Sequence, residues 1–134
     1  MTQAMHLILV IEDEPGIRKV LRVLLEAENY RIIEAGSAER GEIEARTHKP
    51  DLLLVWRSGL NERHKVRLRS LGLPVFESEI RAAAAIPDTL RRLGVLLGHA
   101  DEAAHAAQGF ERDWQGLRQR HAGKPALRVF WQLW

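Results

Sequence analysis

The sequence predicts a three-layer α/β fold built around a mostly parallel sheet. Short, continuous apolar runs at residues 7–11 and 51–56 are typical of strands that are buried on both faces. Segments with helical apolar spacing separate these runs, and such alternation favours parallel strands joined by helices. Glycine and proline lie between the segments, as at residues 72–74 (Gly-Leu-Pro), where a helix is expected to stop.

The first half of the chain predicts three strands and two helices. The strands cover residues 7–11, 31–34 and 51–56. Pro15 suits the first turn of the first helix, because its missing N–H would have no partner there. This helix carries one apolar stripe that we expect to face the core, formed by Ile17, Val20, Leu21, Leu24 and Leu25. Asn29 can end it in a left-handed conformation, and Ser37 can cap the second helix over residues 38–48.

The second half predicts three helices and two strands. Asn61 can cap the third helix, and residues 75–76 begin the fourth strand. Two helices then follow without a strand between them, one over residues 86–97 and a long one over residues 101–122. Residues 127–134 are strongly apolar and predict a fifth strand.

Right-handed crossovers arrange these elements as a single domain over residues 1–134, with a flavodoxin-like sheet of five strands in the order 2-1-3-4-5. An extra long helix precedes the last strand. That strand can pair beside the fourth strand or with another chain, which would give a homodimer through residues 127–134.

Composition excludes several classes of protein. The 134 residues are 46% hydrophobic and 28% charged, which is typical of a soluble globular domain, and the absence of cysteine excludes disulfides and thiolate metal sites. No apolar run approaches the roughly 18 residues of a membrane helix, and no signal peptide is evident, so we expect a cytoplasmic protein without membrane contact. The net charge of +2 comes from interspersed charges, so no nucleic-acid partner is expected.

An acidic run, Glu12-Asp13-Glu14, follows the first strand. Two carboxylates at the carboxyl end of a buried strand form a hard oxygen site suited to Mg²⁺. The segments that follow in order are residues 17–21, Glu34-Ala35, Gly41 and residues 49–52 (Lys-Pro-Asp-Leu). Together these motifs over residues 5–55 resemble the receiver domain of bacterial response regulators, of the potassium-transport regulator type.

The receiver resemblance implies that Glu12 and Asp13 hold Mg²⁺ beside an aspartate that accepts a phosphoryl group. The acceptor belongs five residues after Asp51, and that position is Trp56. An indole cannot accept phosphate, so we expect no phosphotransfer and only weak Mg²⁺ binding at Glu12 and Asp13. The alternative is that these carboxylates are simply solvated ends of a strand.

The chain from Lys49 onward resembles a second family. The carrying stretches are residues 50–59, 61–63, 68–75, 90–94, 123–125 and 128–130. They are similar to the periplasmic cobalamin-binding protein of vitamin B12 ABC importers, which implies that Trp56 contacts a corrinoid and that Glu62 faces the transporter. That family binds its ligand between two lobes. Half of such a cleft is expected to bind a corrinoid weakly, since a pocket must bury most of its ligand.

The sequence contains no complete catalytic constellation. Its histidines do not form a pair at i, i+4 spacing with a third ligand, and no glycine-rich phosphate loop or serine nucleophile with an evident base is present. We therefore expect no enzyme, no catalytic residues and no required cofactor, and we do not expect cobalamin to be a functional ligand.

The two resemblances meet on the strand at residues 51–56, and both families use parallel βα units. We interpret the chain as an engineered chimera, receiver-derived over residues 1–50 and derived from a cobalamin-binding protein over residues 51–134. Its function would be that of a scaffold, without designed catalytic activity or a natural partner. Two alternatives stay open: a degenerate receiver-like signalling module that lacks the acceptor aspartate, and a weak corrinoid-binding module.

Overall fold

The computed structural model describes residues 5–56 and 59–132 of the chain. The chain divides into two compact units, Met1–Glu79 and Ile80–Trp134. The expected seam between the two parent families, near residue 50, lies inside the first unit. The origin of the two parts stays a prediction.

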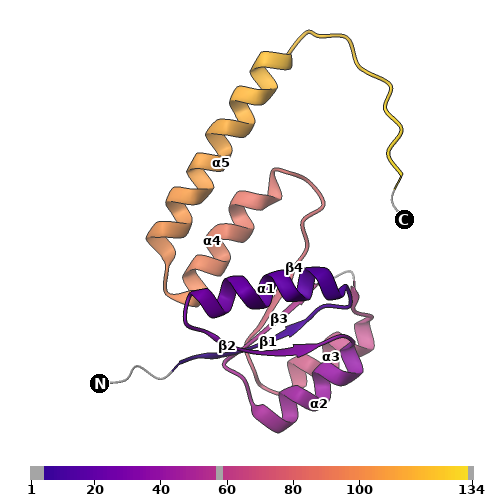
Figure 1. Ribbon diagram of the computed structural model, residues 1–134, viewed down its shortest axis with the longest axis vertical. Helices are drawn as coiled ribbons and strands as arrows, with labels where there is room; N and C mark the ends of the chain where they lie inside the picture. Colours follow the sequence, from indigo (N-terminus) through magenta and orange to yellow (C-terminus); the bar gives the residue numbers. More distant parts are fainter. Residues whose placement is uncertain (1–4, 57–58, 133–134) are drawn as a thin grey trace. The chain divides into compact units, whose positions relative to one another are not determined.

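The first unit alternates strands and helices (Figure 1). Its elements in chain order are β1 (Leu7–Ile11), α1 (Pro15–Ala27), β2 (Arg31–Ala35), α2 (Ala38–His48), β3 (Leu52–Trp56), α3 (Glu62–Ser70) and β4 (Val75–Ser78). The strands pair in parallel in the order β2-β1-β3-β4. The α/β class, the parallel sheet and the order of the first four strands are therefore confirmed.

The core of this unit is centred on β1 and β3. Leu9 and Leu53 are partners in the register of these two strands, and both side chains are fully buried. Figure 1 shows α1 on one face of the sheet and α2 with α3 on the other. Because both faces are covered, the central strands are apolar along their whole length rather than at alternate positions.

Short-range signals in the sequence place the ends of the helices. The Ser37 hydroxyl accepts the Arg40 N–H at 3.2 Å, and the Asn61 side-chain oxygen accepts the His64 N–H at 2.9 Å, so both predicted N-caps are confirmed. Asn29 adopts the predicted left-handed conformation just beyond α1, with a φ of 64°. Lys49 is also left-handed and ends α2 before Pro50.

The second unit is a helical hairpin of α4 (Ala85–Leu97) and α5 (Ala100–His121). Gly94 lies at a close approach of the two helices, because a Cβ atom there would stand 2.1 Å from the Cβ of Ala103. The Arg91 guanidinium donates to both carboxylate oxygens of Glu111, each at 2.9 Å, and joins the same two helices. Both helices match the sequence prediction to within one or two residues.

The predicted fifth strand is wrong. Residues 127–132 form no strand, and residues 133–134 lie outside the described part of the chain. Leu127 is 86% exposed and Phe130 is 87% exposed. An apolar segment becomes a strand only where an edge pairs with it and a face packs on it, and intrinsic preference does not replace these contacts. The five-stranded sheet in the order 2-1-3-4-5 is thus corrected to four strands within the described residues.

The predicted core-facing stripe of α1 is also wrong in part. Ile17 is 52% exposed and Leu24 is 60% exposed, while Leu21 and Leu25 are half-buried. The helix is turned so that Arg18 and Arg22 reach Glu34 on β2, at 3.5 and 3.1 Å. Contacts with β1 and β2 thus decide which side of an amphipathic helix is covered.

No helix in the described ranges has the length and apolar character needed to cross a membrane.

Candidate functional site

The carboxyl ends of β1, β2 and β3 meet at one edge of the sheet. Ile11 is in register with Ala35 and with Val55, at the ends of these strands. The Glu12 N–H donates to the Ala35 carbonyl at 3.0 Å and ties the residue after β1 to the end of β2. Trp56 is the last residue of β3. Open α/β sheets bind ligands at this edge, which makes it the first candidate for a site.

A small cavity joins the acidic pair to the tryptophan. Its volume is about 30 Å³, and its lining residues are Ile11, Glu12, Asp13, Ser37, Ala38, Trp56, Gly59 and Leu60. Glu12, Asp13 and Trp56, which the sequence singled out separately, are therefore brought together. The cavity has room for about one water molecule. It is far below the roughly 300–1,000 Å³ of small-molecule pockets, so it does not enclose a corrinoid.

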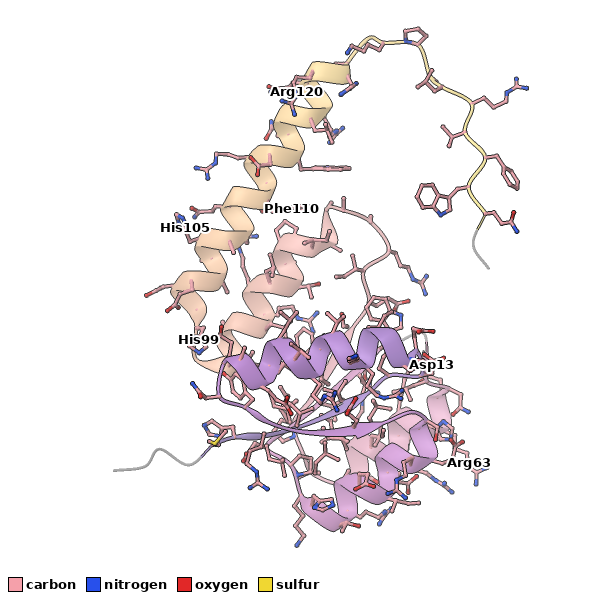
Figure 2. All side chains as sticks on the ribbon, viewed as in Figure 1. Asp13, Arg63, His99, His105, Phe110 and Arg120 are labelled. Carbon is pink, nitrogen blue, oxygen red and sulfur yellow. The ribbon has the colours of Figure 1, made fainter. Side chains whose placement is uncertain are left out.

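Neighbouring residues fix the position of the Glu12 carboxylate and change its pKa. Its carboxylate accepts the Glu14 N–H at 3.0 Å. Burial raises the pKa of the Glu12 carboxyl above its usual range, and the neighbouring Asp13 raises it further. Figure 2 shows Asp13 at the N-terminal end of α1. A bound cation would stabilise both carboxylates in their charged forms and would lower the pKa of Glu12.

The donor set fits a magnesium ion incompletely. Mg²⁺ prefers six oxygen ligands and is usually held by one or two carboxylates, several waters and a phosphate group. Within the part of the chain that the structure describes, no group of three or more His, Cys, Asp or Glu side chains is placed to hold a metal. Arg18 also donates to the backbone carbonyl of Glu12 at 2.7 Å, and its positive charge opposes a cation there. Mg²⁺ binding at Glu12 and Asp13 stays a prediction.

A wider hollow of about 450 Å³ opens beside this cavity. Its lining residues are Asp13, Gly36, Ser37, Ala38, Glu39, Gly59, Leu60, Asn61 and His64. Across it, the imidazole of His64 on α3 lies 3.1 Å from the carboxylate of Glu39 on α2. Hydrogen bonds from the Glu39 backbone and the Ser37 hydroxyl lower the pKa of the Glu39 carboxyl, and the charge of His64 lowers it further. The Glu39 and His64 side chains that line this hollow are thus paired with each other.

The Glu39–His64 pair was not predicted from the sequence. The i, i+4 spacing of metal-binding histidines concerns a single helix, whereas this pair joins two helices. A signal was present, because Ser37 and Asn61 both start helices that follow parallel strands. Helices of this kind begin at the same edge of the sheet, so residues in their first turns are brought together.

Glu62 does not line either hollow. It is the first residue of α3, and its side chain is 79% exposed. Its carboxylate accepts the Lys65 ammonium at 2.8 Å, and the Lys65 side chain is only 9% exposed. The predicted role of Glu62 in contacting a partner is untested by this geometry.

The second unit contains a groove of about 570 Å³ along its helices. The residues that line it are Ala84, Pro87, Phe110, Glu111, Trp114, Gln115, Arg118, Gln119 and Ala122. The rings of Phe110 and Trp114 are stacked, with centroids 6.3 Å apart and planes 10° from parallel. Figure 2 shows Phe110 on α5. The spacing of these aromatic residues predicts a packing seam along the helix, and the structure leaves a part of that seam open as a groove.

Curated relatives match the C-terminal part of the chain. No family model matches it. Over 85 residues it is 38% identical to the vitamin B12-binding protein of Salmonella paratyphi A, and over 87 residues it is 31% identical to that of Vibrio cholerae. These matches cover 63% and 65% of this chain but 32% of each relative. The chain therefore spans about a third of the length of the curated relatives it matches.

Solved structures show two likenesses of fold. The periplasmic vitamin B12-binding protein BtuF of Vibrio cholerae matches with a TM-score of 0.61 at 20% identity, covering 88% of this chain and 51% of that one. The signal receiver domain of a modulated diguanylate cyclase from Desulfovibrio desulfuricans G20 matches with a TM-score of 0.52 at 18% identity, covering 85% of this chain and 99% of that one. The chain is thus similar in its C-terminal part to vitamin B12-binding proteins, and it shares its α/β fold both with such a protein and with a receiver domain, which confirms the two resemblances noted in the sequence.

Proposed function

We propose that this chain is an engineered chimera that acts as a structural scaffold, without designed catalytic activity and without a natural partner. Residues 1–50 would derive from a receiver domain, and residues 51–134 from a cobalamin-binding protein. As a recombinant scaffold it would reside in the cytoplasm, unlike a periplasmic relative.

One observation carries this proposal: Trp56 ends the strand on which the two resemblances meet. The receiver motif requires a carboxylate at this position, next to Glu12 and Asp13. The indole lines the same small cavity as those two carboxylates and leaves no acceptor for a phosphoryl group. The residue that would accept the phosphoryl group in a receiver domain is therefore missing at the position where the resemblance to the cobalamin-binding protein begins.

Weak corrinoid binding is the second candidate. It is favoured by the 38% identity to a vitamin B12-binding protein and by Trp56, which is 39% exposed at the edge of the sheet. An exposed indole offers a flat apolar surface for a large ring system. Against it stands the size of the cavity beside Trp56, which gives a corrinoid only an open surface.

Thermal unfolding with candidate ligands tests these functions. A ligand at 100 times its Kd stabilises the native state by about 2.7 kcal/mol. For a chain of this size that corresponds to a shift in Tm of several degrees. The protein would be melted alone, with Mg²⁺, with Mg²⁺ and a beryllofluoride phosphoryl mimic, and with cobalamin. We expect no shift from the phosphoryl mimic or from cobalamin.

The variant Trp56→Asp is the matched positive control, because it returns a carboxylate to the acceptor position. We expect this variant, and not the parent chain, to gain stability with Mg²⁺ and beryllofluoride together. A clear cobalamin shift in the parent chain would overturn the scaffold proposal in favour of corrinoid binding. A beryllofluoride shift in the parent chain would support a signalling module instead.

A further inference from the structure

We propose that α1 docks against α1 of a second copy of this chain, in an antiparallel pair related by a two-fold axis. The docking surface is the α1 stripe, which we define as Ile17, Val20, Val23 and Leu24. This inference is independent of the proposed scaffold function, which makes no use of α1.

The α1 stripe is apolar and exposed. No residue of α1 is buried, and the four stripe residues are 52%, 56%, 53% and 60% exposed in chain order. With 3.6 residues per turn, they lie within about 120° of the helix circumference over two turns. Single exposed aliphatic residues are ordinary on protein surfaces, but a contiguous group of this kind marks an interaction surface.

The helix cannot bury this stripe by rotating on the sheet. Arg18 and Arg22 pair with Glu34 at 3.5 and 3.1 Å, and Arg18 also donates to the Glu12 carbonyl at 2.7 Å. These interactions lie on the side of the helix that carries the half-buried Leu21 and Leu25. Turning the stripe toward the sheet would break all three polar contacts, so the sheet of this unit does not cover the stripe.

Charges beside the stripe favour a second copy as that partner. Lys19 and Glu26 are seven residues apart and therefore lie on the same flank of α1. Both are exposed, and neither forms a salt bridge with any described residue. In an antiparallel two-fold pair, Lys19 of each copy faces Glu26 of the other, because such an interface brings the same surface of both molecules together. Two reciprocal ion pairs then border the apolar contact.

The ends of the stripe allow close approach. Gly16 and Ala27 are exposed, small residues at the two ends of α1, and an antiparallel pair places each against the other. A helix of 13 residues is about 20 Å long, so the contact is small. Interfaces of this size fall in the weak class, and we therefore expect monomers at micromolar and dimers toward millimolar concentration.

Sedimentation equilibrium of the full chain over that concentration range tests the proposal. The mass should rise from 15.3 kDa toward twice that value. Val20→Glu places a charge in the contact of each copy, and we expect it to weaken the dimer by about tenfold or more. Val66→Glu is the matched control, because Val66 is 61% exposed on α3, and it should leave the association unchanged.

Charge reversal provides a second arm that does not depend on the folding of Val20→Glu. Lys19→Glu should weaken the dimer, and the double variant Lys19→Glu with Glu26→Lys should restore it. A mass of 15.3 kDa at every concentration would overturn the proposal. So would a dimer that survives Val20→Glu, a double variant that fails to recover, or a dimer that is lost in Phe130→Glu alone, which would assign the contact to the exposed C-terminal segment.

Discussion

Replacing glycine by alanine should destabilise the chain at Gly94, where α4 and α5 approach closely, and stabilise it at Gly116, where the new methyl group has open space. Gly94→Ala would place a methyl group 2.1 Å from the Cβ of Ala103 and 2.9 Å from the carbonyl oxygen of His99. Carbon atoms attract one another best at about 3.5–4.0 Å. Neither neighbour is the end of a flexible side chain, so the two helices must move apart to accommodate the new methyl group.

The expected magnitude is a balance of two effects. Overpacking a well-packed contact costs about 1–3 kcal/mol. Alanine regains about 1 kcal/mol over glycine through helix propensity. Because the overlap exceeds 1 Å and involves backbone, we expect the upper part of the packing range and a net loss of about 1–2 kcal/mol. At Gly116 on α5, a new methyl group would meet no atom within 4 Å, so Gly116→Ala should stabilise the chain by about 0.5–1 kcal/mol.

Urea unfolding followed by far-ultraviolet circular dichroism measures both changes. The two helices hold 13 and 22 residues and contribute strongly to the helical signal. The midpoint should fall for Gly94→Ala and rise for Gly116→Ala. Ala103→Gly removes the Cβ atom that clashes but costs about 1 kcal/mol in helix propensity, so the double variant should lose less stability than the sum of the two single variants. An equal rise in both alanine variants would refute the close helix contact.

Three further predictions concern the sheet, the acidic edge and pH. Leu53→Ala removes a fully buried side chain from β3, and its loss of about 2–5 kcal/mol should appear as a lower urea midpoint, whereas an unchanged midpoint would contradict the described core. Trp56→Asp adds a third carboxylate to the acidic pair, so calorimetric titration should show tighter Mg²⁺ binding than in the parent chain; equal binding would argue against a shared site. The hydrogen bonds from Arg91 lower the pKa of the Glu111 carboxyl below its ordinary value of 4.5. The ion pair therefore stabilises the folded chain above that pH, and this contribution is lost as the pH falls through the lowered pKa. Glu111→Gln should therefore lower the Tm near neutral pH but not in acid, and equal losses at both would exclude the ion pair as the cause.

Local sequence determined the helices and their ends. Ser37 and Asn61 are caps because a short side-chain oxygen can accept an N–H that the first turn leaves free. Asn29 and Gly98 end helices because they tolerate positive φ. These effects act over three or four residues, so the ends of each helix can be predicted from its own sequence.

The parallel sheet was also predictable, since continuous apolar runs such as β1 and β3 indicate strands covered on both faces. The meeting of Glu12 with Trp56 at one edge follows from the rule that parallel strands end together. The small size of the cavity between them does not follow, because side chains from two other segments, including Ser37 and Leu60, fill the space.

Only the tertiary structure decided the rest. Residues 127–132 have the composition of a strand and form none, because apolar composition alone does not pair a segment with a sheet. The apolar face of α1 was expected in the core, yet Val20 is exposed because Arg18 and Arg22 bind Glu34 and set the rotation of the helix. The hydrophobic pattern determined which residues of this protein can be buried. Contacts between segments distant in the sequence decided which of those residues are buried, because burial depends on what each face of a helix or strand packs against.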